Sequence, residues 1–333
     1  MKNILITGGG GFIGRNLIEA LLNIRTTNHI IIVDNFITSD KRDFLNFIKR
    51  FEENKLSFYT YDITNERLID YLMDDLKYKN IHTVDEIYHL ASLASPPFYK
   101  KYPIETLDVG YLGTKNMLEV AKKYNAKILF SSTSEVYGDA LVSPQHEEYY
   151  GNVNCFGERS CYDISKRVAE ALCYTYLKMY GVDVKIARIF NTYGPHMLLN
   201  DGRIITEVIR HLKNDTTLTI YGDGNQTRSC CFVNDTVRML IKLMNTYMND
   251  PVNIGNNEER TINDTVNIIE KVWNEMFGTE KSVNKVYKTL TQNDPLQRKP
   301  CLKFNKQVLG ENEYTSFEKG IKQTISYFIN NKE

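Results

Sequence analysis

Two residues that could transfer a proton stand four positions apart in the segment CYDISKRVAEAL, namely Tyr162 and Lys166. Residues at i and i+4 share one face of a helix, and this segment has a helical pattern. A lysine cation beside a phenol lowers the pKa of the phenol, so that the phenolate can act as a base near neutral pH. The pair therefore predicts a proton-transfer site, although Tyr-x-x-x-Lys alone is a weak signal.

The same predicted helix contains a second pair with this spacing, Tyr174 and Lys178. Twelve positions at about 100° per residue turn that pair about a third of a turn away, and we expect it at the surface. Tyr162 is favoured because it lies one loop after SSTSEVYG (131–138), where a predicted strand ends in two hydroxyls and a carboxylate. We expect the catalytic residues to be Thr133, Ser134, Glu135, Tyr162 and Lys166.

A glycine-rich turn near the start of the chain predicts a dinucleotide site. In ILITGGGGFIGRNL, Gly8, Gly11 and Gly14 follow a strand and open a helix. Such a turn lets the backbone approach a pyrophosphate, which the free N–H groups and positive dipole end of the helix bind. Asp34 ends the next strand 20 residues after Gly14, and a carboxylate there accepts both ribose hydroxyls and repels a 2′-phosphate.

This arrangement favours NAD over NADP, although Lys41 and Arg42 follow closely and leave NADP open. Asp62, after SFYTY, is a candidate for the adenine amino group, and a strand-end cap is an equally good interpretation. We expect the NAD site to comprise Gly8, Gly11, Phe12, Ile13, Gly14, Asp34, Asn35, Asp62, Ile63, Leu90, Ala91 and Lys166.

The elements that must position these residues alternate between apolar, β-rich runs and helical patterns. Strands are expected at 3–7, 30–34, 56–62, 86–92, 127–133 and 184–190. Near-continuous apolar strands separated by helices indicate a parallel sheet covered on both faces. The predicted fold class is α/β, a Rossmann-type doubly wound parallel sheet with a smaller C-terminal α/β substrate lobe.

After about residue 191 the alternation loosens and turn-rich segments appear. A helix is expected over 261–277, with Thr261 or Asn263 as its N-cap. We expect the NAD-binding domain to span 1–190 with about 229–250, and the smaller substrate lobe to span 191–228 and 251–333.

The composition excludes several classes of function. The formal net charge is zero, which argues against nucleic acid or an anionic membrane as the main partner. The first apolar run is too short for a signal peptide or a membrane span. The six cysteines form no C-x-x-C pair and the histidines have no metal-ligand spacing. We expect reduced thiols, a cytoplasmic protein and no metal.

The glycine turn, Asp34 and the Tyr162–Lys166 pair together resemble the extended short-chain dehydrogenase/reductase superfamily. A closer resemblance comes from segments that fall in order along nearly the whole chain, from about Asn3 to the C-terminal helix. These are VDNF, IYHLAS with ASPP, STSEVYGD, CYD with KRVAE, ARIFNTYGP, NDGR, YGDGNQTR, PVNIGN and DPLQRKP. They resemble the UDP-glucuronic acid decarboxylase (UDP-xylose synthase) family.

Four positions depart from the family pattern. Leu93 stands for a proline, Gly110 for an asparagine, His196 for an arginine, and Cys230–Cys231 for other residues. Gly110 is expected in a helix at the active site or at a dimer face, where it loosens the helix by up to about 1 kcal/mol. It puts the local role of the usual asparagine in doubt.

The resemblance implies a role for each matching residue. Thr133 and Tyr162 would hold the sugar 4-hydroxyl, Lys166 would bind the nicotinamide ribose, and Glu135 would lie near C5 and the carboxylate. The UDP-sugar site would be lined by Asn191, Arg203, Tyr221, Arg228 and Arg298. Arginine suits a diphosphate because its planar fork donates two parallel hydrogen bonds.

The reaction that the resemblance implies is oxidation at C4, loss of carbon dioxide from the resulting β-keto acid, and return of the hydride. The related 4,6-dehydratases typically carry Thr-Asp-Glu, where this chain has Ser134 in the middle. A second carboxylate about 4 Å from the substrate's own would cost of order 4 kcal/mol at an effective dielectric constant of ~20. Glu135 is itself an acid, and must be protonated, shielded by arginine or turned away.

Other interpretations remain open. A nucleotide-sugar 4,6-dehydratase is the first alternative and a 4-epimerase the second, since epimerases usually lack a glutamate at position 135. An NAD-binding regulator is a non-enzymatic alternative, against which the intact Thr133, Tyr162 and Lys166 argue. A homodimer is expected through helices near 103–124 and 160–180, because ALCYTYLKMY is apolar around much of its circumference.

Overall fold

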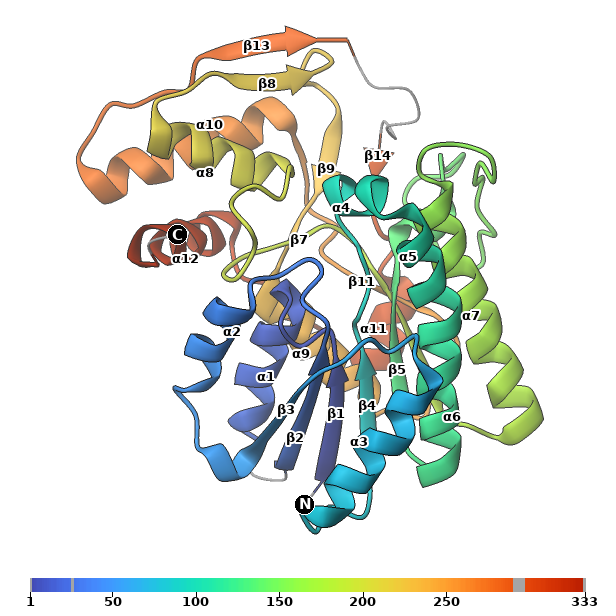
Figure 1. The fold of residues 1–333 in the computed structure, drawn as a ribbon. Helices are drawn as coiled ribbons and strands as arrows, with labels where there is room; N and C mark the ends of the chain where they lie inside the picture. The colour runs from blue at the N-terminus through green and yellow to red at the C-terminus, as the bar shows by residue number, and fades with distance from the viewer. Residues whose placement is uncertain (1, 25–26, 290–296, 332–333) are drawn as a thin grey trace.

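A seven-stranded parallel sheet forms the centre of the protein (Figure 1). The computed structural model describes residues 2–24, 27–289 and 297–331. The strand order is β11-β6-β5-β4-β1-β2-β3, and every neighbouring pair is parallel. The strands are β1 (Lys2–Thr7), β2 (Thr27–Asp34), β3 (Leu56–Thr60), β4 (Glu86–His89), β5 (Lys127–Thr133), β6 (Val184–Ile189) and β11 (Val252–Ile254). The predicted fold class is confirmed.

Both faces of the sheet are buried, because alternate apolar side chains on each strand point to opposite sides. Ile4 and Ile6 pack on one side and Leu5 packs on the other. The first face is covered by α1 (Phe12–Leu22), α2 (Lys41–Ile48) and α9 (Val233–Met244). The second face is covered by α3 (Glu66–Tyr78), α6 (Thr114–Tyr124) and α7 (Ser160–Tyr180).

The strand order reverses at β1, which lies between β2 and β4. In open α/β sheets the ligand crevice lies at such a switch point, outside the carboxyl ends of the strands. Two expected strands were too long at this edge: β3 ends at Thr60 rather than 62, and β4 ends at His89 rather than 92. Beyond these residues the chain leaves the sheet, and both segments line the cavity described below.

A smaller lobe lies above the carboxyl edge of the sheet (Figure 1). It contains a three-stranded sheet of order β12-β9-β14 and a parallel pair of β8 and β13. Its elements are α8 (Ile204–Asn214), β8 (Leu218–Tyr221), β9 (Thr227–Ser229), β12 (Glu259–Thr261), α10 (Ile262–Phe277), β13 (Lys285–Lys288), β14 (Gln297–Arg298) and α12 (Phe317–Asn330). The Thr261 side chain caps α10 by accepting from the Asp264 N–H, so Thr261 is the N-cap and Asn263 is not.

Short elements connect the two parts. They are α4 (Pro96–Lys101), α5 (Pro103–Asp108), a π-helical turn η2 (Val109–Gly113), the 3₁₀ turns η1 (Glu53–Lys55) and η3 (Ser134–Tyr137), β7 (Thr192–Tyr193), β10 (Cys231–Phe232) and α11 (Lys303–Leu309). The expected boundary near residue 250 assigns 252–254 to the UDP-sugar lobe, but β11 pairs with β6 in the main sheet. The rest of the domain division stays a prediction.

Three residues of the motif DPLQRKP, Asp294, Pro295 and Leu296, lie outside the described residues. Within the described part of the chain, no helix combines the length and apolar character that crossing a membrane requires.

Gly110 lies in the π-helical turn, buried against α7. A Cβ atom placed there would come within 2.5 Å of the Ser165 Cβ and 3.0 Å of its Cα and carbonyl oxygen. The close approach of the two backbones therefore leaves no space for the asparagine that the family resemblance places at this position. Ser165 follows Tyr162 by three residues and donates its hydroxyl to the Tyr162 carbonyl oxygen at 2.8 Å.

Gly110→Asn should lower the free energy of unfolding by at least 1–3 kcal/mol, because overpacking at a backbone contact displaces both helices. Adding Ser165→Gly should recover part of this loss, with a coupling energy above ~1 kcal/mol in a double-mutant cycle. Urea unfolding measures both quantities.

Gly181→Asn is the matched control, since Gly181 has a φ of +69° and open space around its Cα, and asparagine tolerates this conformation. A Gly110→Asn protein as stable as the wild type would show that the turn has more space than the backbone contact allows.

Candidate active site

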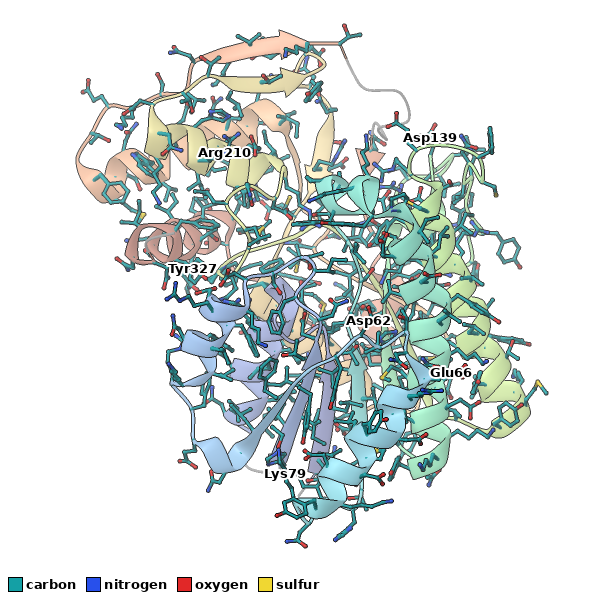
Figure 2. The ribbon with its side chains drawn as sticks, in the orientation of Figure 1. Asp62, Glu66, Lys79, Asp139, Arg210 and Tyr327 are labelled. Carbon is teal, nitrogen blue, oxygen red and sulfur yellow. The ribbon has the colours of Figure 1, made fainter. Side chains whose placement is uncertain are left out.

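A cavity of about 1470 Å³ opens between the carboxyl edge of the sheet and the smaller lobe. The sequence-predicted site residues all line it: Gly8, Gly11, Phe12, Ile13, Gly14, Asp34, Asn35, Asp62, Ile63, Leu90, Ala91, Thr133, Ser134, Glu135, Tyr162, Lys166, Asn191, Arg203, Tyr221, Arg228 and Arg298. Figure 2 shows both parts with their side chains, with Asp62 beside the sheet and Arg210 in the smaller lobe.

The glycine turn has the close backbone contacts that a dinucleotide cradle requires. Gly8 has a φ of +71°, and a Cβ there would lie 2.7 Å from the Ala91 nitrogen. A Cβ at Gly14 would lie 2.4 Å from the Gly8 carbonyl oxygen. Helix α1 begins after Gly11 without a side-chain cap and without an acidic residue in its first turn. Its first N–H groups are therefore available to a pyrophosphate, and the residues present fit NAD.

Asp34 is fixed by two backbone N–H groups. One carboxylate oxygen accepts from Gly10 at 2.8 Å and the other from Phe36 at 2.8 Å. Burial raises the pKa of Asp34, and these two hydrogen bonds and the charge of Arg15 oppose the rise. Each oxygen has a further lone pair for a ribose hydroxyl. Lys41 and Arg42 do not line the cavity, so neither is placed to bind a 2′-phosphate. The carboxylate of Asp34 does line it and disfavours a 2′-phosphate.

Asp62 caps its own turn and also lines the cavity. One oxygen accepts from the N–H and the hydroxyl of Thr64, at 2.9 and 2.7 Å, and the other accepts from the Asn35 amide at 3.1 Å. The strand-end cap is therefore present, and a contact with adenine stays a prediction.

Sequence analysis did not identify Arg15, which binds the backbone of the glycine turn. Its Nε donates to the Gly10 carbonyl oxygen at 2.9 Å, and its guanidinium pairs with Asp43 and lies over the rings of Phe44 and Phe47. No pattern separates Arg15 from a surface arginine, because these partners come from α2.

Tyr162 and Lys166 are both buried at the start of α7. Lys166 Nζ donates to the Ser131 carbonyl oxygen at 2.7 Å and lies 5.9 Å from the centroid of the Tyr162 ring. Burial lowers the pKa of Lys166 to about 7. Tyr174, of the second pair, is 62% exposed, which confirms its place at the surface.

We expected Lys166 to lower the pKa of Tyr162. When the groups of the protein alone are considered, this prediction is wrong. Burial raises the pKa of Tyr162, and a hydrogen bond with Thr133 and the charge of Arg203 only partly oppose it. Desolvation outweighs these contacts because the Tyr162 side chain is buried. Tyr99 from α4, which the sequence did not indicate, stacks on the Tyr162 ring with centroids 5.3 Å apart and planes at 11°.

Glu135 is held between two arginines. Arg298 Nη2 donates to Glu135 Oε2 at 2.7 Å, and Arg159 Nη2 donates to the same oxygen. Burial alone would raise the pKa of Glu135, but the charges of Arg298 and Arg159 outweigh it and lower the pKa. Of the three states that the sequence left open, the structure supports an ionised Glu135 shielded by arginine.

Arg298 also fixes the backbone beside Glu135. Its Nη1 donates to the carbonyl oxygens of Gly138 at 2.8 Å and Ser134 at 3.2 Å. Its Nε is buried and has no hydrogen-bond partner among the described residues. The sequence missed Arg159, because nothing in NCFGERSCYD separates it from a loop arginine.

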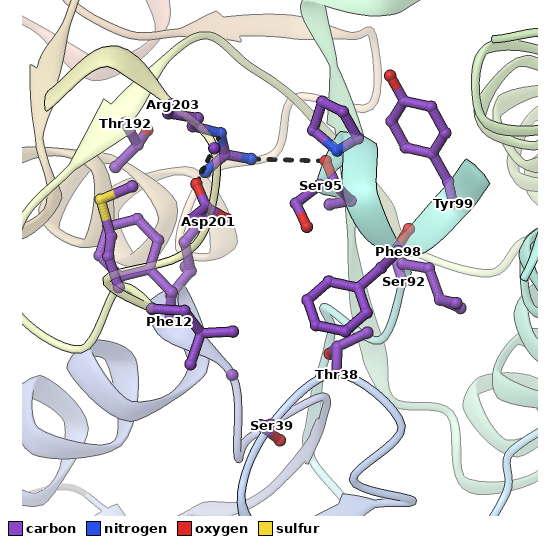
Figure 3. A pocket seen from close by; sticks show the side chains of 18 of the residues that line it. Phe12, Thr38, Ser39, Ser92, Ser95, Phe98, Tyr99, Thr192, Asp201 and Arg203 are labelled. Atoms are coloured by element: carbon purple, nitrogen blue, oxygen red, sulfur yellow. Dashed lines mark hydrogen bonds and ion pairs between the residues drawn. The ribbon is translucent and has the colours of Figure 1, made fainter. Parts of the chain in front are cut away.

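Arg203 spans the cavity (Figure 3). It pairs with Asp201 at 3.3 Å and donates to the Ala94 carbonyl oxygen at 3.5 Å on the opposite wall, where Ser95 and Phe98 also lie. Of the family departures, His196 lines the cavity, where its ring lies edge-on to Phe47 and tilted against Tyr327.

The remaining departures are largely buried. Leu93 packs in the core beneath α3 and α6. Burial raises the pKa of the Cys230 thiol to about 11 and of the Cys231 thiol to about 12. All six cysteines are free thiols.

A doubly wound sheet with a glycine turn, Asp34 and a Tyr-x-x-x-Lys pair at one cavity defines the class of extended short-chain dehydrogenase/reductases. In agreement, residues 4–255 match the NAD dependent epimerase/dehydratase family.

Similar curated proteins indicate which group within this class the chain belongs to. The chain is 41% identical over 327 residues to UDP-glucuronic acid decarboxylase 1 of Xenopus tropicalis, covering 98% of this chain and 72% of that protein. It is 42% identical to UDP-glucuronic acid decarboxylase 6 of Arabidopsis thaliana, covering 96% and 86%. Among solved structures, the UDP-glucuronic acid 4-epimerase of Bacillus cereus, in complex with UDP-glucuronic acid and NAD, aligns with a TM-score of 0.83, 27% identity and coverage of 98% and 99%. The chain therefore belongs to the UDP-glucuronic acid decarboxylases within the NAD dependent epimerase/dehydratase family.

Glu135→Gln should lower the free energy of unfolding by about 2–4 kcal/mol at pH 7, because it leaves buried Arg298 without its counter-ion. The folded pKa of Glu135 lies below its ordinary value of 4.5. The contribution of the carboxylate is therefore complete above pH 4.5 and is lost as the pH falls through the folded pKa. Urea midpoints followed from pH 8 down to about pH 2 should converge for the two proteins at the acidic end, below the folded pKa of Glu135.

Glu158→Gln is the matched control, since this glutamate pairs with exposed Lys100 at the surface, and its midpoint should stay near the wild-type value. A constant gap between Glu135→Gln and the wild type across this pH range would contradict ionisation of Glu135 in the folded protein.

Proposed function

We propose that this protein converts UDP-glucuronic acid to UDP-xylose and carbon dioxide through a 4-keto intermediate, with Tyr162 as the base and no net oxidation. The observation that carries the proposal is the site itself: the Tyr162 phenol and Thr133 lie beside a carboxylate, Glu135, that is outnumbered by two arginines. Identity of about 41% over nearly the full chain to decarboxylases supports the same substrate.

In this proposal the two parts of the cavity hold different ligands. NAD lies along the glycine turn, Asp34 and Lys166, and supplies oxidation by accepting the C4 hydride and returning it. The UDP-sugar lies on the smaller lobe, among Asn191, Arg203, Tyr221, Arg228 and Arg298. The division of the chain into an NAD-binding domain and a UDP-sugar lobe follows from this placement.

Tyr162 removes the proton from the sugar 4-hydroxyl, with Thr133 holding the same oxygen. The C6 carboxylate is then β to a ketone, and the C5–C6 bond breaks with release of carbon dioxide. The electron pair passes to the C4 oxygen as an enolate, which the Tyr162 hydroxyl stabilises as a fixed donor. Protonation at C5, return of the hydride to C4 and return of the Tyr162 proton give UDP-xylose. One proton is taken up for each carbon dioxide released.

The alternatives fit the residues of this site less well. A 4,6-dehydratase expels the 6-hydroxyl with an acid, and the position where these enzymes typically have aspartate is Ser134. A 4-epimerase usually lacks a glutamate at position 135, whereas this chain has Glu135 there.

Incubation with UDP-glucuronate and NAD, followed by mass analysis, tests the proposal: UDP-xylose without net NADH supports it. Loss of water from UDP-glucose, or isomerisation of UDP-glucuronate without mass loss, would replace it.

Tyr162→Phe should reduce turnover by 10²–10⁴-fold, since the hydroxyl acts mainly in the transition state. Binding of NAD and UDP-glucuronate, measured by calorimetry, should change little. Tyr174→Phe is the matched control, because Tyr174 has the same spacing to a lysine on the exposed face of the same helix. If Tyr162→Phe kept more than about a tenth of wild-type turnover, another base would be required.

We also propose a homodimer formed through α5, η2 and α7. Large apolar side chains are exposed there, including Ile104 at 64%, Tyr174 at 62% and Met179 at 67%. An apolar area of this kind indicates a protein interface. Light scattering at micromolar concentration should give twice the chain mass, and Met179→Arg should shift it to one chain mass. Tyr247→Arg, at an exposed site beyond α9, should leave the dimer intact, and a wild-type monomer would refute the proposal.

A cytoplasmic location belongs to the same proposal, since six free thiols are kept in a reducing compartment.

A further inference from the structure

Asp163, the residue after Tyr162, is a buried carboxyl group that the reaction described above does not use. Among the residues that the structure describes, its Oδ1 atom is buried without a hydrogen-bond partner. Its Oδ2 atom lies 3.9 Å from Arg159 Nε, beyond hydrogen-bond distance. An ionised carboxylate in such a place would lack the donors that usually compensate its burial. A protonated carboxyl group would not carry this cost.

The groups that face Asp163 come from four elements. Arg159 precedes α7, Glu135 lies in η3, Arg298 lies in β14, and Tyr99 lies on α4. Burial and the charge of Glu135 raise the pKa of Asp163 to about 7, against the charges of Arg159 and Arg298.

The pKa values of the nearby tyrosines and of the nearby thiol are all raised. The pKa of Tyr99 is raised to about 12, and burial raises the pKa of the Tyr162 phenol and of the Cys161 thiol. The groups around Asp163 whose charges change or persist near neutral pH are therefore the two arginines and the two carboxyl groups. Lys166, whose pKa burial lowers to about 7, also titrates in the cavity in this range.

We propose that Asp163 sets the net charge of the sugar end of the cavity and thereby its selectivity for an anionic sugar. With Asp163 protonated, Arg159, Arg298 and ionised Glu135 carry one surplus positive charge, which a sugar carboxylate neutralises. With Asp163 ionised, the surplus is cancelled and the carboxylate enters without a counter-charge. The inference rests on the proposed function, because it takes the anionic sugar to be glucuronate.

Asp163 acts through Arg159 and through space rather than by contact, since it is not among the residues that line the cavity. It is therefore a positioning and specificity residue and not a catalytic one. At an effective dielectric constant of ~20 and with screening by salt, one unit charge in this cluster should change the affinity for a sugar carboxylate by about tenfold.

The experiment compares UDP-glucuronate with UDP-glucose, because both contain the diphosphate and only the first contains the sugar carboxylate. Binding is measured by calorimetry with saturating NAD in a Tyr162→Phe background, so that the ligand is not converted. The ratio of the two affinities is followed from pH 6 to pH 8.5. The preference for UDP-glucuronate should fall about tenfold as the pH rises. In Tyr162→Phe/Asp163→Asn the ratio should be high and independent of pH, since asparagine is permanently neutral.

Tyr162→Phe/Asp139→Asn is the matched control, because Asp139 is an exposed aspartate on the loop after η3 (Figure 2), and it should keep the pH dependence. A flat ratio in the Tyr162→Phe parent would overturn the proposal even if the Asp163 variant did not fold. The same pH dependence in Asp163→Asn would also overturn it, and would assign the titration to another group such as Lys166. Failure of wild-type protein to decarboxylate UDP-glucuronate would reject the proposed function separately, since the affinity ratio does not depend on turnover.

Discussion

The contact of Glu135 with Arg159 and Arg298 joins three segments that are distant in sequence: η3 at the end of β5, the turn before α7, and β14 of the smaller lobe. Removing a carboxylate and a guanidinium from water costs several kcal/mol for each ion, and only good geometry with further hydrogen bonds offsets it. Here Arg298 also binds the carbonyl oxygens of Ser134 and Gly138. The sugar end of the cavity therefore exists only when both lobes are in place.

A buried polar network holds β14 where this contact requires it. The Gln145 backbone exchanges hydrogen bonds with Lys299 and Cys301, and its side chain accepts from the Lys299 N–H at 2.9 Å. Asn253 of β11 donates to the carbonyl oxygens of Gln145 and Cys301 and accepts from the Tyr137 hydroxyl. Strand β11, which pairs with β6 in the main sheet, thereby connects the end of η3 to the segment that supplies Arg298.

Local patterns predicted the sheet, the glycine turn, Asp34 and the Tyr162–Lys166 pair, because each depends on periodicity or on the conformational freedom of glycine within a short segment. The residues that were missed depend on long-range contacts. Arg159 needs Glu135 as its partner, Arg15 needs Asp43 on α2, and Tyr99 needs the Tyr162 ring. The pKa of Tyr162 was also misjudged, since helix spacing places Lys166 nearby but gives no measure of how strongly the fold desolvates the phenol.

In the proposed reaction, the fate of the 4-keto sugar depends on charge more than on the base. Tyr162, Lys166 and the glycine turn serve any oxidation at C4, so they do not decide which bond breaks next. Loss of carbon dioxide turns a carboxylate into a neutral molecule and leaves the electron pair on the sugar. A surplus of positive charge therefore aids binding of the carboxylate but opposes its loss as neutral carbon dioxide. The ionised Glu135 limits that surplus. Two arginines balanced by one permanent and one titratable carboxyl group can satisfy both requirements, which a site with arginines alone cannot.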